Sequence, residues 1–376
     1  MRKFVITKQE AGWRFDKYLK KLLPRAASGF LYKMLRKKNI TLNEKKATGN
    51  EVVAAGDTVE VFFSEETYRK FSETFSDRER TGRERGGGDE KIPEKMSFTD
   101  TCQAYREAYQ KLKGIFAVYE DDNILILNKP AGILSQKADK KDISLNEWMI
   151  GYLLEKGRMT EEELVLFRPS VCNRLDRNTS GLMLCGKSVR GSQFLSEMLR
   201  ERGLHKYYVT YVQGRIKEEI TLKGYLKKEE KRNRSEIISE KEFKRRKLRE
   251  PGLEREYKKI ETVISPLFYV KERDCTKLEI LLVTGRSHQI RAHLAGIGHP
   301  VLGDKKYGQA LRRQEDYVFR YQLLHAGRVE FPEIKGEFGY LSGVSLTAPE
   351  PEDWNILPGA AGSENRNAVP EKYGGR

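Results

Sequence analysis

The sequence predicts an α+β protein, in which strands follow one another in hairpin-like runs instead of alternating regularly with helices. The segments 205–214 and 257–270 are rich in aromatic and β-branched residues, which favour strands. Apolar residues with helical spacing are concentrated at 12–25 and 28–39, ahead of these strands. The chain has 376 residues, more than a typical single domain, so we expect two domains.

The composition indicates a globular protein with a polyanionic partner. Hydrophobic residues make up 38% of the chain, enough for a core, while charged residues make up 34%. The formal charge of +16 favours nucleic acid ahead of a membrane surface as the partner. No apolar run approaches the roughly 18 to 20 residues that span a bilayer, and residues 1–12 lack the apolar core of a signal peptide. We therefore expect a cytoplasmic protein with no membrane partner.

The pattern near the N-terminus predicts a small basic module of helices and strands. An amphipathic helix covers 12–25, and Ser28 can cap a second helix that ends near Asn39. Short strands follow at 40–43 and 57–63, separated by glycine and asparagine turn residues. A generic basic helical domain is the alternative to a dedicated binding module.

Three fragments of this module resemble a known RNA-binding domain. The sequences RFDKYLKKLLP, LRKKNITLN and AAGDTVEV are similar to the small domain named after ribosomal small-subunit protein four. The resemblance covers only residues 1–63 and implies an α/β RNA-binding domain there. We expect Lys37 and Lys38 to contact RNA.

Three further segments stand apart in composition. Residues 64–113 include the low-complexity run DRERTGRERGGGDEK, which predicts a flexible linker, and 351–376 predict a disordered tail. Between them we expect a catalytic domain at 114–350. Its segment 223–259 has 15 lysines and arginines but only 8 acidic residues, so it holds +7 of the +16. This basic insertion is either an exposed hairpin that grips phosphates or a mobile surface loop.

The remaining local patterns predict the elements of the catalytic domain. Strands are expected at 124–127, 181–188, 205–214, 257–270, 276–285 and 321–331, and helices at 145–154, 191–202 and 289–295.

Histidines 288, 293 and 299 raise the question of a metal site. The first two are five positions apart, so they do not share one helical face as the i, i+4 pair of a zinc-protease helix does. No cysteine is near, and Asp304 is the first carboxylate that follows. We expect no metal.

Other chemistries are weakly supported. A triad of Ser180, His288 and Asp176 would lack a nucleophile-elbow context around the serine. Cys172 could be a nucleophile, but a small residue in an apolar context is more often packed, and the four cysteines show no CxxC spacing. The glycines at 86–88 are not followed by Lys-Ser/Thr, so no nucleotide cofactor is indicated.

The stretch NRLDRNTSG, residues 173–181, is the best candidate for a catalytic site. Its carboxylate, Asp176, lies between Arg174 and Arg177, whose positive charges favour the ionised form. A short polar turn follows and can expose this carboxylate.

Five stretches in order resemble the pseudouridine synthases of the RluA type: NKPAG, NRLDRNTSGLML, HKYYVTYVQG, TGRSHQIRAHLAGIGHPVLGD and LLHA. The resemblance covers about 115–350. It implies a catalytic domain with a mixed, mainly antiparallel sheet flanked by helices. It also implies an isomerase that needs no cofactor, which agrees with the lack of nucleotide and metal motifs.

The resemblance assigns roles to three residues. Asp176 is the catalytic aspartate, acting at the uridine while its base is detached, turned and rejoined through carbon. Arg291 is the basic partner that keeps the carboxylate ionised and oriented. Tyr208 stacks on the uracil and takes part in proton transfer, although the neighbouring Tyr207 is one register step away on the opposite face.

Four cations are expected to contact RNA or to line the same cleft. Arg174 would fill the space that the flipped uridine leaves, and Arg177, Arg286 and Lys129 would lie nearby. One residue departs from the family pattern, because Asn173 stands where a histidine is usual. Asparagine cannot become charged, which suggests a subgroup with its own substrate.

The leading hypothesis is therefore an isomerase of uridines in large-subunit ribosomal RNA, with transfer RNA as a second substrate class. The alternatives are a ribosome-associated RNA-binding protein with a vestigial catalytic domain, and a metal-dependent nuclease. We expect a monomer whose partner is RNA.

Overall fold

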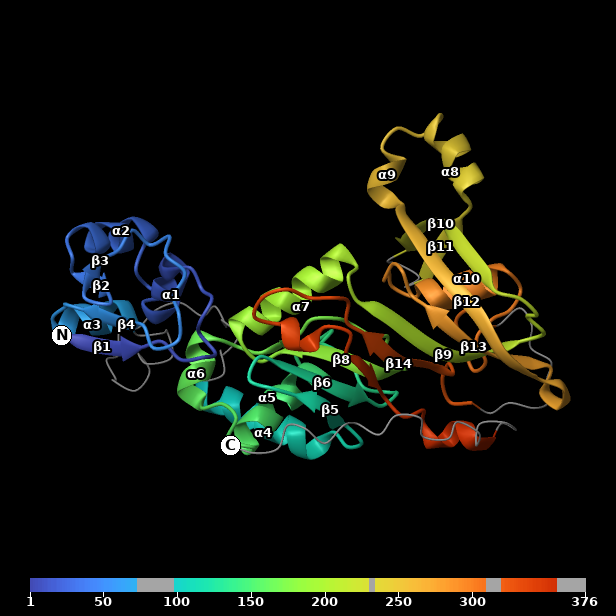
Figure 1. Cartoon of the computed structure of the whole chain (residues 1–376), viewed down its shortest axis with the longest axis horizontal. Coiled ribbons are helices and arrows are strands. Elements are labelled where there is room, and N and C mark those ends of the chain that lie inside the picture. Colours follow the sequence, from blue (N-terminus) through green and yellow to red (C-terminus); the bar gives the residue numbers. More distant parts are fainter. Residues whose placement is uncertain (73–97, 230–233, 309–318, 357–376) are drawn as a thin grey trace, which may run out of the picture. The chain divides into compact units, whose positions relative to one another are not determined.

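The computed structural model describes residues 1–72, 98–229, 234–308 and 319–356 (Figure 1). Two compact units divide the chain. The first holds 1–129, 133–177 and 183–201, and the second holds 130–132, 178–182 and the chain from 202 onward. Among the described residues, none of the helices is both long and apolar enough to cross a bilayer.

The N-terminal part of the first unit is a small antiparallel sheet covered by helices. The strand order is β1-β4-β2-β3. Its strands are β1 (Arg2–Val5), β2 (Ile40–Leu42), β3 (Lys45–Lys46) and β4 (Thr58–Val61), and its helices are α1 (Phe15–Leu22), α2 (Ser28–Arg36) and α3 (Glu65–Ser72). Phe15 and Leu19 lie one turn apart on α1 and are fully buried, so the amphipathic stripe faces the core of this module.

The predicted helices and strands of this module are confirmed, with two corrections. Ser28 is the first helical residue and not the cap; the cap position is Ala27, whose backbone is extended. Strand β1 was not predicted, because four residues with little burial give almost no alternation. It is held by backbone pairing from Arg2 against Val61 to Val5 against Thr58.

The rest of the first unit consists of strands packed with helices. Strand β6 (Ile124–Lys129) pairs with β5 (Phe116–Glu120) and lies beside β8 (Ser180–Gly186), which also pairs with β7 (Ser170–Val171). The helices are α4 (Phe98–Lys111), α5 (Leu145–Glu155), α6 (Glu161–Leu166) and α7 (Val189–Glu201). Residues 124–127 are completely buried, which explains their continuous apolar run.

The prediction of a flexible linker over 64–113 is wrong at both of its described ends. Helix α3 belongs to the N-terminal module, and α4 packs closely on α5. The carbonyl of Tyr105 lies so near Gly151 that a Cβ there would be 2.1 Å away, and the Trp148 indole donates to the Leu112 carbonyl at 3.2 Å. Residues 73–97, which contain the low-complexity run, lie outside the described residues.

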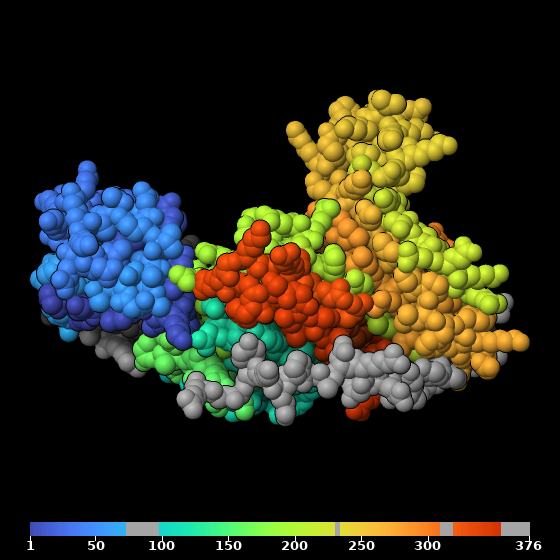
Figure 2. All heavy atoms as spheres, in the orientation of Figure 1, coloured from blue at the N-terminus to red at the C-terminus, as the bar shows by residue number. Residues whose placement is uncertain are grey.

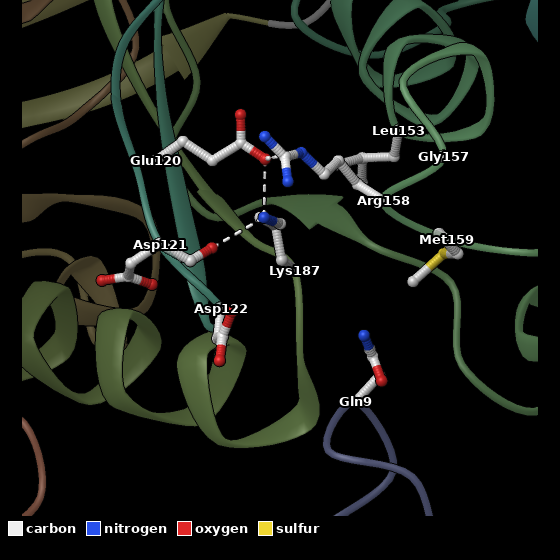
Figure 3. A pocket seen from close by; sticks show the side chains of 9 residues that line it. All are labelled: Gln9, Glu120, Asp121, Asp122, Leu153, Gly157, Arg158, Met159 and Lys187. Atoms are coloured by element: carbon white, nitrogen blue, oxygen red, sulfur yellow. Dashed lines mark hydrogen bonds and ion pairs between the residues drawn. The ribbon is translucent and has the colours of Figure 1, made fainter. Parts of the chain in front are cut away.

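The first unit also contains a polar cavity of about 400 Å³ (Figure 3). Lys187 crosses it and bonds the Glu120 carboxylate and the Asp121 carbonyl, each at 2.6 Å. Arg158 adds a second cation 3.8 Å from Glu120. The lining includes none of the predicted catalytic residues, and Glu120, Lys187 and Arg158 form ion pairs within it, so the cavity is a structural feature.

The second unit is built on a mainly antiparallel sheet with the order β11-β10-β12-β13-β9-β14. Its strands are β9 (His205–Gln213), β10 (Ile220–Glu229), β11 (Arg234–Ile238), β12 (Lys258–Val270), β13 (Cys275–Leu281), β14 (Leu324–Glu330) and β15 (Ser345–Thr347). Its α-helices among the described residues are α8 (Glu240–Lys247), α9 (Leu253–Glu256) and α10 (Gln289–Gly296). The first residues of β8 add a parallel pairing to β14. The α+β class and the mixed, mainly antiparallel sheet are confirmed.

Two segments of the second unit differ from expectation. The basic insertion is a hairpin of β10 and β11 that continues into α8 and α9 before the chain enters β12. The predicted tail begins with a short 3-10 helix, Glu352–Ile356, whose Trp354 is 1% exposed and packs against Tyr211. Residues 357–376 lie outside the described residues.

Candidate active site

Asp176 lies on a loop that runs from β7 to β8 and is tied down on its N-terminal side. The Asn173 side-chain oxygen accepts from the Leu184 amide at 2.7 Å. Ser135 holds Leu175 on both sides, accepting from its amide at 3.0 Å and donating to its carbonyl at 2.8 Å. Asp176 itself is half-buried, so the loop presents a carboxylate from a fixed backbone. The Asn173 side chain therefore has a structural role, the hydrogen bond to Leu184, that does not require a charged group.

Lys129, at the end of β6, is buried beneath the same loop. Its side chain is 0% exposed, and the ammonium donates to the carbonyls of Ile133 at 2.9 Å and of Arg177 at 3.1 Å. Burial lowers the pKa of Lys129 to about 7, and the negative charge of Asp176 acts in the opposite direction. In this structure the Lys129 side chain is therefore not accessible to RNA.

The other predicted RNA contacts lie on the surface. Arg174 and Arg177 are exposed on either side of Asp176, and Arg286 is exposed ahead of α10. Lys37 and Lys38 are exposed just after α2, and Lys38 has a positive φ of 59° that turns the chain into β2. These side chains have the accessibility that a phosphate contact requires.

The C-terminal side of the aspartate loop belongs to the second unit and is held by the segment that leads into β14. Gln322 donates to the Thr179 hydroxyl at 3.3 Å, and Ser180 bonds His325 Nδ1 at 2.9 Å. Gly181 has φ +111°, and a Cβ there would lie 2.3 Å from the Ala326 carbonyl oxygen. Only glycine fits this close approach of two backbones.

The Ser180 contacts contradict a triad with His288. His325 donates from Nε2 to the Ala348 carbonyl at 3.2 Å, so its Nδ1 accepts from Ser180. Both side chains are almost completely buried, and His288 bonds Tyr307 at 3.1 Å instead. The Ser180–His325 pair is therefore a structural link.

Arg291, on α10, forms a buried ion pair with Asp304. Its Nε and Nη2 donate to the two carboxylate oxygens at 2.6 and 2.9 Å, which is the strong bidentate geometry. Burial alone would raise the pKa of Asp304, but the hydrogen bond and charge of Arg291 hold it below its usual value. Asp304 also accepts from the amides of Lys306 and Tyr307 at 2.9 and 3.1 Å. The guanidinium is thus fixed in direction.

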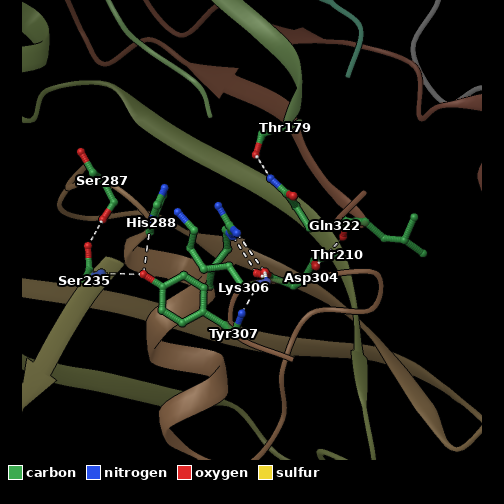
Figure 4. Close-up of polar contacts among 11 residues, drawn as sticks. Thr179, Thr210, Ser235, Ser287, His288, Asp304, Lys306, Tyr307 and Gln322 are labelled. Carbon is green, nitrogen blue, oxygen red and sulfur yellow. Dashed lines mark hydrogen bonds and ion pairs between the residues drawn. The ribbon is translucent and has the colours of Figure 1, made fainter. Parts of the chain in front are cut away.

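Tyr307 extends this network to strand β11. The Arg291 guanidinium lies over its ring, 5.2 Å from the centroid. The Tyr307 hydroxyl accepts from the Ser235 amide at 2.7 Å, and the Ser235 hydroxyl donates to the Ser287 carbonyl at 2.8 Å (Figure 4). The loop before α10 is therefore bonded to the first residues of strand β11 in the basic hairpin.

The two tyrosines of β9 face opposite sides of the sheet, as the alternation predicts. Tyr208 is 7% exposed and pairs in register with Ile280. Tyr207 lies on the other face with the Arg328 guanidinium 3.7 Å from its ring centroid. This cation contact already occupies Tyr207.

The three clustered histidines do not converge. His293 is buried and bonds Thr262 at 2.9 Å, and burial lowers its pKa to about 4. His299 bonds the Gln213 carbonyl at 2.8 Å, while His288 bonds Tyr307. Within the part of the chain that the structure describes, no group of three or more His, Cys, Asp or Glu side chains could hold a metal ion.

Cys172 does not have the environment of a nucleophile. Burial raises the pKa of its thiol to about 11, so the reactive thiolate is disfavoured at neutral pH. All four cysteines are free.

The structure shows two supporting contacts that sequence reasoning missed. Asp304 was considered only as a distant metal ligand, yet it is the carboxylate that orients Arg291. Lys129 was expected to contact RNA or to line the cleft near Asp176, and its bond to the Arg177 carbonyl from within the fold was not predicted. Both lie in stretches that resemble the pseudouridine synthases, GHPVLGD and NKPAG.

The fold is therefore α+β, and Asp176 lies half-buried on a loop whose backbone is bonded by Ser135 and Lys129. A family model described as RNA pseudouridylate synthase matches residues 123–296. Ribosomal large subunit pseudouridine synthase C of Rickettsia bellii is 31% identical over 344 residues, which cover 91% of this chain and 96% of that protein. The protein of the same name from Salmonella typhimurium is 28% identical, covering 92% of this chain and 88% of its own. Among solved structures, Human RNA Pseudouridylate Synthase Domain Containing 4 is 16% identical, with a TM-score of 0.48 over 69% of this chain and 95% of that chain.

The chain belongs to the RNA pseudouridylate synthase family, whose members are isomerases. Its reaction is the isomerisation of uridine in RNA.

Proposed function

We propose that this enzyme converts uridines of large-subunit ribosomal RNA to pseudouridine, with Asp176 as the catalytic carboxylate. The names of its relatives and the charge of +16 support a ribosomal RNA substrate. The observation that carries the assignment of Asp176 is its loop: Ser135 bonds the backbone of Leu175, Lys129 bonds the carbonyl of Arg177, and the carboxylate between them remains half-buried.

The reaction is balanced without a cofactor. The bond from ribose C1′ to uracil N1 breaks, the base turns, and a bond from C1′ to C5 forms. C5 loses its hydrogen and N1 gains one, so the product is an isomer. The ionised Asp176 supplies the nucleophilic carboxylate during this exchange.

Tyr208 and Arg291 complete the proposed catalytic set. Tyr208 stacks on the uracil and assists proton transfer at C5. Arg291, whose guanidinium is fixed in direction by Asp304, is the proposed basic partner in the reaction, because a fixed guanidinium loses little freedom when it makes a bond.

The uridine must leave its base stack to reach the carboxylate, which costs a few kcal/mol. We assign Arg174 to the vacated space and Arg177 and Arg286 to neighbouring phosphates, in keeping with their exposure. The N-terminal module, residues 1–63, is proposed as a separate RNA-binding domain of the type named after ribosomal small-subunit protein four. Lys37 and Lys38 would lie on its contact surface.

The test is tritium release from ribosomal RNA labelled at uracil C5, with a chelator present. The wild-type chain should release tritium, Asp176→Asn should release none, and the exposed Asp100→Asn should match the wild type. Release from transfer RNA alone would reassign the substrate. Tight RNA binding without release would instead establish the vestigial alternative, and strand cleavage would establish a nuclease.

A further inference from the structure

The basic insertion forms a small folded lobe, which we call the arm: residues 220–229 and 234–259, comprising β10, β11, α8, α9 and the first residues of β12. It has its own apolar core. The rings of Tyr225 and Phe243 stack with their centroids 3.6 Å apart, and Leu253 and Tyr257 are buried against Phe243. Figure 2 shows the atoms of α8 and α9, in yellow and gold, as a protrusion. The arm is therefore a shaped surface and not a loose loop.

The outer face of α8 is cationic. Phe243 points into the arm, and a helix turns about 100° per residue, so Lys241, Lys244 and Arg245 point outward. All three are exposed, as is Lys247 at the end of the helix. Leu248 follows directly and is 89% exposed, which places one large apolar side chain among these cations.

The two carboxylates of α8 are paired within the arm. Glu242 pairs with Arg245 and Arg246, and Glu240 lies 3.7 Å from Lys259. Among the described residues, Lys241, Lys244 and Lys247 form no ion pair. Their charges are directed to solvent, where a polyanion can meet them.

The beginning of strand β11 connects the arm to the residues around Arg291. Ser235 of β11 bonds the Tyr307 hydroxyl and the Ser287 carbonyl, and the Arg291 guanidinium lies over the Tyr307 ring. The arm thus extends from the same network that orients Arg291.

We propose that the arm is a third RNA-binding surface, additional to the N-terminal module and the loop of Asp176. Lys241, Lys244 and Lys247 contact phosphates, and Leu248 packs against an unpaired base or a ribose. This inference rests on the proposed function, because it takes RNA as the substrate. A single exposed leucine is too little for a membrane surface, which requires a broad apolar face.

The experiment compares two triple variants of the full chain in tritium release from labelled ribosomal RNA. In the first, Lys241, Lys244 and Lys247 become glutamine; in the control, the exposed Lys113, Lys271 and Lys335 become glutamine. The arm variant should raise KM about tenfold and reduce the salt dependence of RNA affinity by about 2 to 3 in logarithmic slope, since each phosphate contact contributes roughly 0.9. The control should change KM less than twofold.

A third variant, Leu248→Ser, tests the apolar contact. It should raise KM about threefold without changing the salt slope, because no charge is removed. Thermal unfolding of each variant excludes a folding defect. Equal KM values for the arm variant and the control would overturn the inference. It would also be overturned if the arm variant lost binding to vesicles with 30% phosphatidylglycerol but kept its binding to RNA. If the wild type releases no tritium, the proposed function fails, and filter binding of ribosomal RNA still decides the role of the arm.

Discussion

Lys129 and the lysines of the arm show what burial does to the same side chain. Lys129 is fully buried, has a pKa lowered to about 7, and uses its ammonium on two backbone carbonyls. Lys241, Lys244 and Lys247 are exposed and have no carboxylate partner among the described residues. A buried cation fixes the backbone and is insensitive to salt, whereas an exposed cation contributes through long-range attraction that salt screens. The sequence alone does not distinguish the buried lysine from the exposed ones.

The contrast extends to ion pairs. Arg291 and Asp304 are desolvated and bidentate, with side chains 8% and 0% exposed. Lys111 and Glu107, one helical turn apart on α4, are 58% and 45% exposed at 2.8 Å. Distance alone would rank these pairs as similar, while burial separates them. Four measurements test this comparison between buried and exposed groups.

The largest effect is expected for Asp304→Ala, which removes the buried bidentate bond between Asp304 and Arg291. Removing one member of a buried pair costs about 3 to 5 kcal/mol. Urea unfolding should show this loss in the free energy of unfolding. A loss below about 1 kcal/mol would mean that water reaches the guanidinium and that Arg291 is not fixed by this pair.

The next effect is a pH dependence from His293. Burial lowers its folded-state pKa to about 4 from the usual 6.5, so between these values the unfolded chain binds the extra proton and the folded chain does not. Stability from this residue is complete above about pH 6.5 and is lost as pH falls through 4, by up to roughly 3 kcal/mol. His293→Gln should flatten the stability curve in that window, and His205→Gln, at an exposed site, should leave it unchanged.

Lys129→Met should act on turnover and not on RNA affinity. Methionine keeps the apolar stem but removes the bond to the Arg177 carbonyl, so the loop of Asp176 loses a support. We expect kcat to fall about ten- to a hundredfold, or about 1.4 to 2.7 kcal/mol, with KM changed less than twofold. A rise in KM with a reduced salt slope would instead restore the expectation that Lys129 contacts RNA.

The smallest effect is expected for Glu107→Gln. An exposed i, i+4 pair contributes about 0.3 to 0.5 kcal/mol, and salt removes part of that. Urea unfolding at 0.05 and 0.5 M NaCl should show a difference from the wild type that shrinks as salt rises. A loss as large as that of Asp304→Ala would contradict the comparison as a whole.

The fold was predictable where a local pattern reports burial. Strands such as β6 and β9 follow from apolar runs and aromatic or β-branched content. Helix α4 was missed because its neighbours in sequence are polar, and its packing partner α5 lies more than thirty residues away. Helical propensity alone could not outweigh the charged composition around it.

The candidate site could be proposed from the sequence, but the contacts that support it could not be predicted. Asp176 is recognisable from its neighbours and from a family resemblance. That Lys129 lies inside and that Asp304 meets Arg291 depends on tertiary contacts across 48 and 13 positions of sequence. No local pattern encodes which of many cations is desolvated.

The Ser180–His325 link provides a spectroscopic reporter beside the loop of Asp176. Because Nε2 of His325 donates to a buried carbonyl and Nδ1 accepts from Ser180, the ring is locked in one tautomer and its N–H is shielded from exchange. Such a proton gives a separate NMR signal that is absent for mobile histidines. Its chemical shift, followed during RNA titration, would record whether the loop keeps its resting geometry when the substrate arrives.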